Sequence, residues 1–481
     1  MTASLRWLLA IAASALVAGC AIPPRPAHPD VAHAALLAGI ESSSTAAWPD
    51  RAWWTRYHDA QLDDLQARAL RDAPTLVVAR ARLDQAERYV DVARADAGAT
   101  VSGNAQLQRD RLSEQGLIPS QFLGFNWYGQ GDLGLSFNYD FDFWGSHGAD
   151  IAAATDRARA AAAERDSAAS MIAAAVADTY FGWQADQARL AIAREIVAGY
   201  TRGRTIAAAR AHQGLDANDV VHRADAELAA AREQVAMLEG DTRIQLAALA
   251  GLLGVAPADL PKLTAHSLPP ATAALPANAG LDLIARRADV AASRWRVEAA
   301  LKDVDVARAA FYPDVSLSAM AGLSSIDLGK LLSPGSTVFA AGPALHLPIF
   351  EGGRLRARFG VSQAALAAAV ADYRAAVVDA AREVSAQALK LRQIQERRQQ
   401  SAEQLAAKAQ LLASARARMR QGLSDAVPAL DAGETLDRQR DASVQLDAAA
   451  LSAEIALTRA LGGGYGTEAS ASQSTSGAAS P

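Results

Sequence analysis

The sequence predicts a mainly α-helical chain with a small β part, built from two similar halves. Residues 361–421 contain no Gly and no Pro, and they are rich in Ala, Leu, Arg and Gln, which favour helices. Residues 133–143 alternate apolar side chains with small or polar ones, which is typical of a strand with one apolar face. The hexapeptide Val-Asp-Val-Ala-Arg-Ala at 90–95 recurs at 304–309, which indicates an internal duplication.

A second pair of matched segments supports the duplication. The triplet Gln-Gly-Leu at 213–215 recurs at 421–423, in the same order relative to the hexapeptides. We therefore expect one repeat over residues 59–254 and a second over 281–462, each containing a helix, two strands, a long helix and a return helix. The Pro-rich stretch 255–280 is the expected connector.

The helices and strands are expected in the same order in each half. The first helix of each half is expected at about 61–97 and 283–310, the long helix at about 149–212 and 361–421, and the return helix at about 219–249 and 427–461. The second long helix would measure about 90 Å. The expected strands are near 101–107, where the pattern is weakest, and at 133–143, 315–319 and 339–349.

The N-terminus is typical of a secreted protein. Arg6 precedes an apolar run, residues 7–17, which is too short to span a bilayer, so residues 1–19 are expected to be a signal peptide. Small residues directly before Cys20 resemble the bacterial lipoprotein box, which implies cleavage and lipidation there, whereas an ordinary signal peptide with a chance Cys is the alternative. Residues 20–58 would be a Pro-rich tether, and the Gly- and Ser-rich residues 463–481 a disordered tail.

Several classes of function receive no support from the sequence. The net charge of −5 does not favour a nucleic-acid partner. The single Cys excludes a disulfide framework, and the eight His show no spacing typical of metal ligands. Neither a phosphate-binding loop nor a nucleophile motif is present. We therefore predict no catalytic residue, no cofactor-binding site, no metal site and no enzymatic activity.

The strands set a physical problem. A strand of about ten residues with one apolar and one polar face is typical of a membrane-spanning barrel. Four strands cannot close a barrel, and an open edge has no hydrogen-bonding partner in lipid. The chain is thus either soluble with a small sheet or shares a barrel with other copies, and its aromatic-rich strand face favours the shared barrel. We expect lipid contact for Leu135, Phe137, Tyr139 and Phe141, and a lumenal position for Ser136, Asn138 and Asp140.

Three further segments carry a family resemblance. Trp53-Trp54 precedes an Asp- and Leu-containing segment, and residues 139–145 (YDFDFWG) and 348–356 (PIFEGGRLR) link a strand to a long helix in each half. Together with the duplicated element order, they make residues 50–462 resemble the TolC-like outer membrane factor family, and the lipoprotein box resembles its NodT-type branch. The resemblance implies a lipid-anchored homotrimer, in which twelve strands form a transmembrane β-barrel continued by a coiled-coil-like helical tunnel across the periplasm.

The resemblance also implies a function. A family member would be the outer-membrane exit duct of a tripartite efflux pump, passing small molecules passively from an inner-membrane pump and a periplasmic adaptor, also called a membrane fusion protein. The channel of a type I protein secretion system is the alternative, and a periplasmic adaptor or a structural lipoprotein fits less well. Bulky aromatic residues close to the strand ends would lie near the periplasmic rim, namely Trp144, Phe311, Tyr312 and Phe350.

Two kinds of site residue follow from the resemblance. By position, the adaptor would contact the turns at the ends of the long helices, formed by Gly214, Leu215, Gly422 and Leu423. Asp431 would belong to an acidic pore constriction that favours cations. Pro428 stands where the family has another acid, and Asp219 lies one residue before the family's acid in the first half, so this constriction would be built differently.

Overall fold

The computed structural model describes residues 23–25, 27, 47–113, 124–276, 283 and 285–466. The expected signal peptide and Cys20 lie outside the described residues, as does most of the expected C-terminal tail. The chain divides into two units. Unit one comprises residues 1–31, 83–160 and 293–372, and unit two comprises residues 32–82, 161–292 and 373–481.

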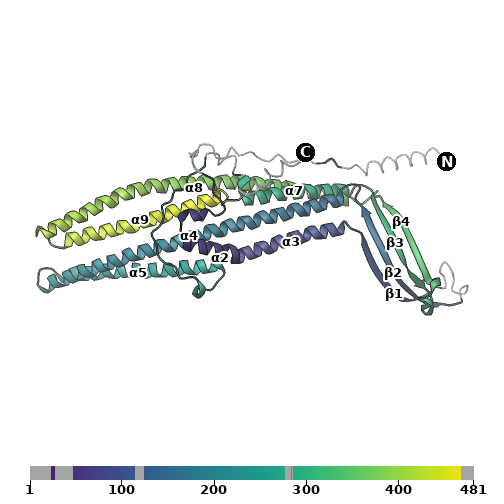
Figure 1. Cartoon of the computed structure of the whole chain (residues 1–481), viewed down its shortest axis with the longest axis horizontal. Helices are drawn as coiled ribbons and strands as arrows, with labels where there is room; N and C mark the ends of the chain where they lie inside the picture. The colour runs from purple at the N-terminus through teal and green to yellow at the C-terminus, as the bar shows by residue number, and fades with distance from the viewer. Residues whose placement is uncertain are drawn as a thin grey trace. The chain divides into compact units, whose positions relative to one another are not determined.

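The two halves of the sequence contain the same series of elements (Figure 1). The first half has α3 (Pro74–Asp96), β1 (Thr100–Arg111), β2 (Trp127–Phe141), α4 (Ser146–His212) and α5 (Asn218–Leu253). The second half has α7 (Ala288–Ala309), β3 (Asp314–Ser325), β4 (Thr337–His346), α8 (Arg354–Arg420) and α9 (Val427–Ala460). The prediction of a mainly helical chain with four strands is confirmed.

The single helix expected at 61–97 is wrong. Two helices occupy this stretch, α2 (Ala60–Asp72) and α3, with Ala73 in an extended conformation between them. Pro74 has no N–H to donate and disfavours a helical conformation at the residue before it, so it ends α2 and begins α3. Gly254 packs closely against this break: a Cβ at position 254 would lie only 2.9 Å from Cδ of Pro74.

The four strands of unit one form one antiparallel sheet in the order β1-β2-β3-β4 (Figure 1). The pairing places Ser102 opposite Ser136, with their hydroxyl oxygens 2.8 Å apart, and Ser324 donates to Asp132 over 2.7 Å. Phe137, on the other face, lies opposite Val101 and Ala319. The alternation predicted from β2 is thus confirmed for the sheet, which has one polar and one apolar face.

The bounds of all four strands depart from the sequence prediction: β1 and β3 run to Arg111 and Ser325, beyond their predicted ends at 107 and 319. β2 begins at Trp127, before the predicted start at 133, because Gln130 and Asp132 continue the pairing with β1. β4 ends at His346, whereas the pattern predicted a strand to 349. Pro348 cannot donate a backbone hydrogen bond to a neighbouring strand, which explains the earlier end.

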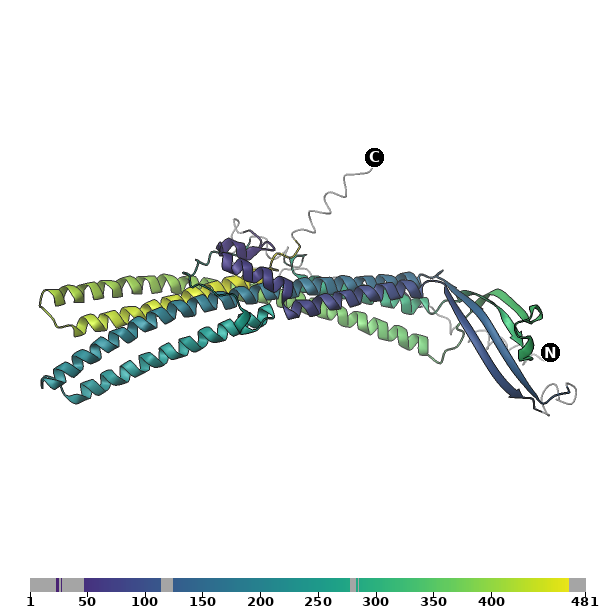
Figure 2. The same ribbon diagram turned by 60° about the horizontal axis from the view of Figure 1, so that its bottom comes forward.

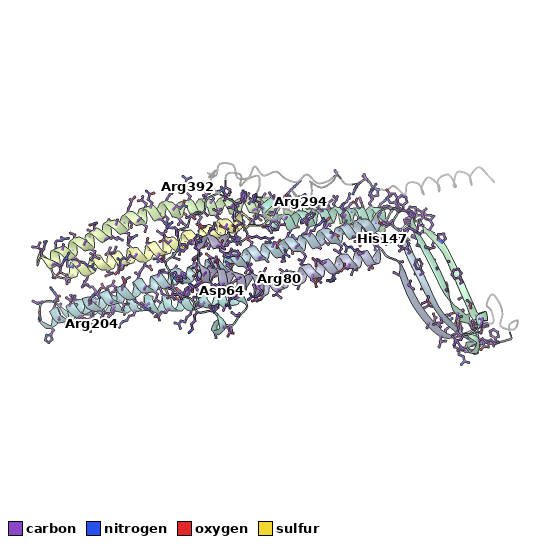
Figure 3. All side chains as sticks on the ribbon, in the orientation of Figure 1. Asp64, Arg80, His147, Arg204, Arg294 and Arg392 are labelled. Carbon is purple, nitrogen blue, oxygen red and sulfur yellow. The ribbon has the colours of Figure 1, made fainter. Side chains whose placement is uncertain are left out.

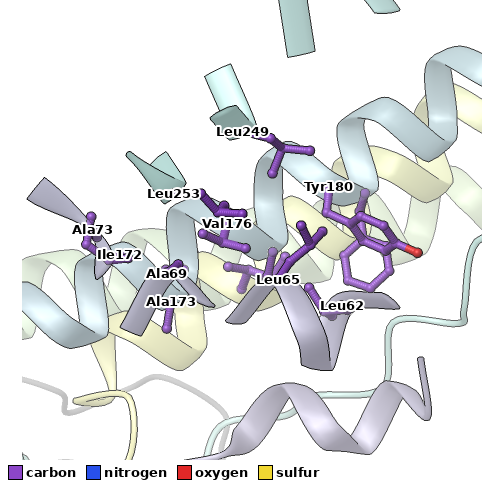
Figure 4. Close-up of a cluster of buried hydrophobic side chains, with 14 of the residues drawn as sticks. Leu62, Leu65, Ala69, Ala73, Ile172, Ala173, Val176, Tyr180, Leu249 and Leu253 are labelled. Atoms are coloured by element: carbon purple, nitrogen blue, oxygen red, sulfur yellow. The ribbon is translucent and has the colours of Figure 1, made fainter. Parts of the chain in front are cut away.

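Unit two has an apolar core around α2 and α4 (Figure 4). The core contains Leu62, Leu65 and Ala69 of α2, Ile172, Val176 and Tyr180 of α4, and Leu249 and Leu253 of α5. Tyr180 is buried, and its hydroxyl group donates a hydrogen bond to the Asp59 carboxylate over 2.6 Å. Asp59 also caps α2 by accepting from the backbone N–H groups of Gln61 and Leu62, so one carboxylate fixes both the start of α2 and its contact with α4.

The described part of the Pro-rich connector is held by side chains of unit two. Glu454 on α9 is fully buried, and its carboxylate accepts from the backbone N–H groups of Thr272 and Ala273 over 2.5 and 3.1 Å. Tyr57 donates to the same carboxylate over 3.0 Å. Burial followed by the negative charge of Glu454 raises the pKa of Tyr57. The connector is therefore bound to the return helix rather than free.

Within unit two, α4 runs beside α5 and α8 beside α9 (Figure 2). Each pair forms a helical hairpin closed by one Gly-Leu turn. Charged side chains cover the outside of these helices, including the labelled Arg204 and Arg392 (Figure 3). Arg204 of α4 pairs with Asp225 of α5 over 2.9 Å, one of the contacts that join the two helices of the first hairpin.

Candidate functional site at the hairpin turns

The two Gly-Leu turns have the same backbone structure. Gly214 has φ +71°, and the N–H groups of Gly214 and Leu215 donate to the carbonyls of Ala211 and Arg210 over 3.0 and 2.9 Å. This pattern is a Schellman motif, which requires a left-handed residue that Gly adopts without strain. The repeated Gly is therefore explained by the end of the long helix.

The second turn repeats this geometry. Gly422 has φ +70°, and the N–H groups of Gly422 and Leu423 donate to the carbonyls of Met419 and Arg418 over 3.1 and 2.9 Å. The turn that follows the second long helix is thus a copy of the first in conformation as well as in sequence.

The leucines of the two turns are not explained by helix capping. In a Schellman motif the apolar residue after the Gly often packs against a residue five positions earlier, and these positions hold Arg210 and Arg418 here. Leu215 is 63% exposed and Leu423 is 71% exposed. Two apolar side chains are thus left in solvent at equivalent places of the two halves.

An ion-pair network connects the two turns. Arg210 donates from Nε to Asp216 over 2.6 Å and from Nη1 to Asp425 of the second turn over 3.4 Å. The Arg210 guanidinium holds the pKa of Asp216 below its ordinary value. Asp425 also accepts from the backbone N–H of Val427, at the start of α9, over 3.2 Å. The side chains of this network are partly exposed to solvent, which limits how much these ion pairs stabilise the turns.

A cavity of about 810 Å³ lies between the two hairpins of unit two. Asp431 and Pro428 of α9 and Val220 of α5 are among its lining residues. The Asp431 side chain is exposed and has no hydrogen-bond or ion-pair partner among the described residues. The structure therefore brings Asp431 to the wall of this cavity, but it does not bring Asp219, Leu215 or Leu423 there.

A partly exposed polar cluster, which no sequence pattern predicted, joins α4 to α9. Tyr200 of α4 donates its hydroxyl hydrogen to Glu434, and Arg438 donates to the Tyr200 oxygen over 2.8 Å. Burial, and then the hydrogen bond to Glu434, raise the pKa of Tyr200 to about 12. The four-residue spacing of Glu434 and Arg438 on α9 could have suggested their ion pair. No local signal could have supplied Tyr200, which comes from another helix.

Two further ion-pair contacts link the same helices. Arg189 of α4 pairs with Asp441 of α9 over 2.8 Å. Arg440 of α9 pairs with Asp437 over 3.0 Å and with Glu195 of α4 over 3.6 Å. Burial raises the pKa of Asp437 despite the nearby Arg440. Together with the Tyr200 cluster, these contacts join the two hairpins beside the cavity.

The aromatic residues expected near a membrane rim are found in unit one. The rings of Trp144 and Tyr312 stack with their centroids 4.5 Å apart, and Trp144 Nε1 donates to the Pro313 carbonyl over 2.7 Å. Phe311 contacts Phe359 edge to face at 6.1 Å, whereas Phe350 is 88% exposed. Stacking therefore places one aromatic pair directly between the end of β2 and the start of β3.

The described helices and side chains lack two other kinds of feature. None of these helices has a stretch both long enough and apolar enough to cross a bilayer. Among the described residues there is also no group of three His, Cys, Asp or Glu side chains placed to hold a metal ion.

The sheet, the duplicated hairpins and the exposed turns together define the class of outer-membrane channel proteins. The chain superposes on the outer-membrane channel OprN with a TM-score of 0.82 at 27% identity, covering 92% of this chain and 99% of OprN. With the outer membrane protein VceC from Vibrio cholerae the TM-score is 0.75 at 32% identity, covering 87% of this chain and 100% of VceC.

Sequence comparison gives the family. The multidrug resistance outer membrane protein MdtP of Escherichia coli K12 is 30% identical over 473 residues, which is 95% of each chain. The family model for outer membrane efflux proteins matches residues 65–255 and again 281–463, once in each half. The chain belongs to the outer membrane efflux protein family. The resemblance drawn from the sequence is confirmed, and the protein is an outer-membrane efflux channel.

Proposed function

We propose that three copies of this chain form the exit duct of a tripartite efflux pump. The four-stranded sheet supports this proposal. Its polar side chains share one face, and its edge strands, β1 and β4, have no further partner strand among the described residues. Unpaired edge groups cannot remain in lipid, so β4 of one copy pairs with β1 of the next. Three four-stranded sheets then close a twelve-stranded barrel with its polar face inward.

Conduction through this duct is passive. The polar face of the sheet, with Ser136, Asn138 and Asp140 of β2, lines water, and the apolar face with Phe137 meets lipid. The helical hairpins continue the wall into the periplasm. The duct catalyses no reaction, and an inner-membrane pump supplies the energy. Small molecules are the cargo, and a type I secretion role is the second candidate.

The hairpin turns are the docking points of the periplasmic adaptor. Leu215 and Leu423 are exposed on turns that do not require an apolar residue, and a partner that covers them removes apolar surface from water. The exposed carboxylates of Asp431, one from each copy, form a ring that favours cations and disfavours anions. The cavity beside Asp431 allows the hairpins to change their separation when the constriction opens.

The anchor of this duct is the acylated Cys20, exposed after removal of residues 1–19. The expected tether, residues 20–58, ends earlier than the sequence predicted, because Trp53–Tyr57 forms a short 3-10 helix and Trp53 is buried in the apolar core of unit two. Residues 59–254 and 281–462 form the two repeats, joined by residues 255–280. A lipid-anchored chain that also contributes four strands to a barrel has two independent attachments to the outer membrane.

The mass of the purified protein in mild detergent tests the assembly. We expect a species of three chains, and Phe339→Arg on the apolar face of β4 should lower its yield, because an Arg facing lipid costs about 2–4 kcal/mol. Ser318→Arg on the polar face of β3 is the matched control and should assemble. A stable, helical monomer of the unmodified protein would refute the shared barrel.

A further inference from the structure

A second cavity, of about 450 Å³, lies entirely within unit one. Its wall includes Trp144, three residues after β2 ends, and Tyr312, two residues before β3 begins. The other charged and polar parts of the wall are Arg25, Lys302, Asp305 and Arg308. We call this space the rim cavity. It holds on the order of fifteen water molecules, which is enough room for a phosphoglycerol group.

The rim cavity has an excess of positive charge. Arg25 pairs with Asp305 over 2.5 Å, which neutralises one cation and the single lining carboxylate. Arg308 uses Nε to donate to the Pro23 carbonyl over 3.0 Å, and its two Nη groups have no partner among the described residues. Lys302 makes no hydrogen bond or ion pair with any described residue. Two cations are therefore available to a ligand.

The first repeat has two equivalent cations, but no N-terminal residue is bound beside them among the described residues. Arg88 and Arg94 stand 214 positions before Lys302 and Arg308, at the equivalent places on α3. Arg88 pairs with Asp91 over 3.0 Å and with Asp84 over 3.5 Å, and Arg94 pairs with Asp91 over 3.7 Å. The cations of the first repeat are thus neutralised on their own helix.

The second repeat differs because the N-terminal segment lies on it. Asp305 is the counterpart of Asp91, but it is occupied by Arg25. The carboxylate that would neutralise Arg308 is thereby removed from it, and Lys302 also remains unpaired among the described residues. The positive charge of the rim cavity is therefore a specific result of where residues 23–25 bind.

The start of α4 does not supply this positive charge. Its first backbone N–H groups are met by Asp142, whose carboxylate accepts from Gly148 over 2.8 Å. A ligand anion would consequently be bound by the Lys302 and Arg308 side chains. Lys and Arg bind phosphate oxygens through charge-assisted hydrogen bonds.

The aromatic side of the cavity indicates the source of the anion. Trp144 and Tyr312 are stacked, and Trp and Tyr are enriched where a bilayer meets water. Phe143 also lines the cavity and is 64% exposed. The cavity thus has a cationic side and an apolar side next to the ends of two strands. A phospholipid needs both, one for its phosphate and one for its acyl chains.

We propose that the rim cavity binds the phosphate of an anionic glycerophospholipid, with Lys302 and Arg308 on the phosphate and Trp144 and Tyr312 beside the glycerol and the upper acyl carbons. The proposal rests on the proposed insertion of the sheet in the outer membrane. A zwitterionic lipid fits less well, because its ammonium group would lie near two unneutralised cations. Bound lipid at this place would tie the helices of unit one to the membrane surface.

Native mass spectrometry of the detergent-solubilised protein tests the proposal. Phosphatidylglycerol and phosphatidylethanolamine are added separately, and we expect preferential retention of phosphatidylglycerol. Lys302→Gln with Arg308→Gln should lower this retention on the order of tenfold, because each Lys or Arg beside an anionic lipid adds a measurable share of the binding. Arg88→Gln with Arg94→Gln, at the equivalent positions of the first repeat, should leave retention unchanged.

Three results would overturn the lipid site. The first is equal retention of the two lipids by the unmodified protein. The second is equal loss of phosphatidylglycerol in the two double variants. The third is full displacement of phosphatidylglycerol by millimolar inorganic phosphate, which would indicate a site for a free anion. The first and third measurements use the unmodified protein, so they stand even if a variant fails to fold. Failure of the proposed function appears separately, as a monomeric mass.

Discussion

Substituting the two exposed leucines by Asp should stop export while leaving the channel assembled. Leu215→Asp and Leu423→Asp place a carboxylate where we propose that the adaptor makes apolar contact. The backbone of each turn is set by its Gly and by carbonyls of the preceding helix, so the change does not remove a capping group. The leucines contribute little to folding, because they are 63% and 71% exposed.

The exposed fractions set the size of the effect. Full burial of a Leu side chain is worth about 1.5–3 kcal/mol, so covering the exposed part of each turn is worth roughly 1–2 kcal/mol per leucine. Losing the apolar contacts of both leucines of a chain would cost about 2–4 kcal/mol, which is roughly a 30- to 1000-fold loss in the equilibrium constant for adaptor binding. Desolvating the new carboxylates on docking adds to this cost.

Drug susceptibility is the assay, in a strain that carries the double variant at normal channel levels in the outer membrane. We expect susceptibility close to that of a strain without the channel, and weaker crosslinking to the adaptor. Gln213→Asp with Gln421→Asp is the matched control, since it adds the same charge to the same turns without removing the leucines. Unchanged export in the leucine variant, or equal loss in the glutamine variant, would refute the reasoning.

Three other outcomes are expected. Phe137→Arg should impair assembly by about 2–4 kcal/mol, whereas Asn138→Arg on the polar face should be tolerated; equal yields of folded channel would show that the faces are assigned wrongly. Cys20→Ala should abolish labelling by radioactive palmitate, and persistent label would exclude Cys20 as the acylated residue. Because Arg210 lowers the pKa of Asp216, the pair stabilises the turn above the ordinary Asp pKa and is lost as the pH falls through the lowered value. Amide hydrogen exchange in the turn should therefore accelerate on strong acidification, and an Asp216→Asn variant should lack this acid-dependent step.

The parts of the fold that the sequence predicted are those determined by local chemistry. The alternation in β2 predicted a two-faced sheet, and the repeated Gly at 214 and 422 predicted two helix ends. β1 gave a weak signal, because Gly103 and Ala105 stand at positions on its apolar face where larger residues would mark a strand. The break at Pro74 was missed, since the apolar pattern continues on both sides of it.

The candidate site was predicted only in part, for a related reason. The turn residues follow from short motifs, and so does the placement of Asp431 near the start of α9. Tyr200 and Glu434 meet across 234 residues of sequence, and their contact depends on how two helices pack. The connector was predicted as a break between repeats, but the buried carboxylate of Glu454 that binds it carries no local signal.

The two turns share a backbone, yet their chemistry has diverged. The residue after the exposed leucine is Asp216 in the first turn and Ser424 in the second. If three chains surround one axis, six leucines would alternate between a turn with an acid directly after the leucine, Asp216, and a turn with Ser424 there and its acid, Asp425, one residue later. Adaptor molecules that bind these turns would then find two kinds of site with different affinities, and would occupy the three tighter sites before the three weaker ones. A duplication that began by making the halves alike would thus have given the complex an order of assembly.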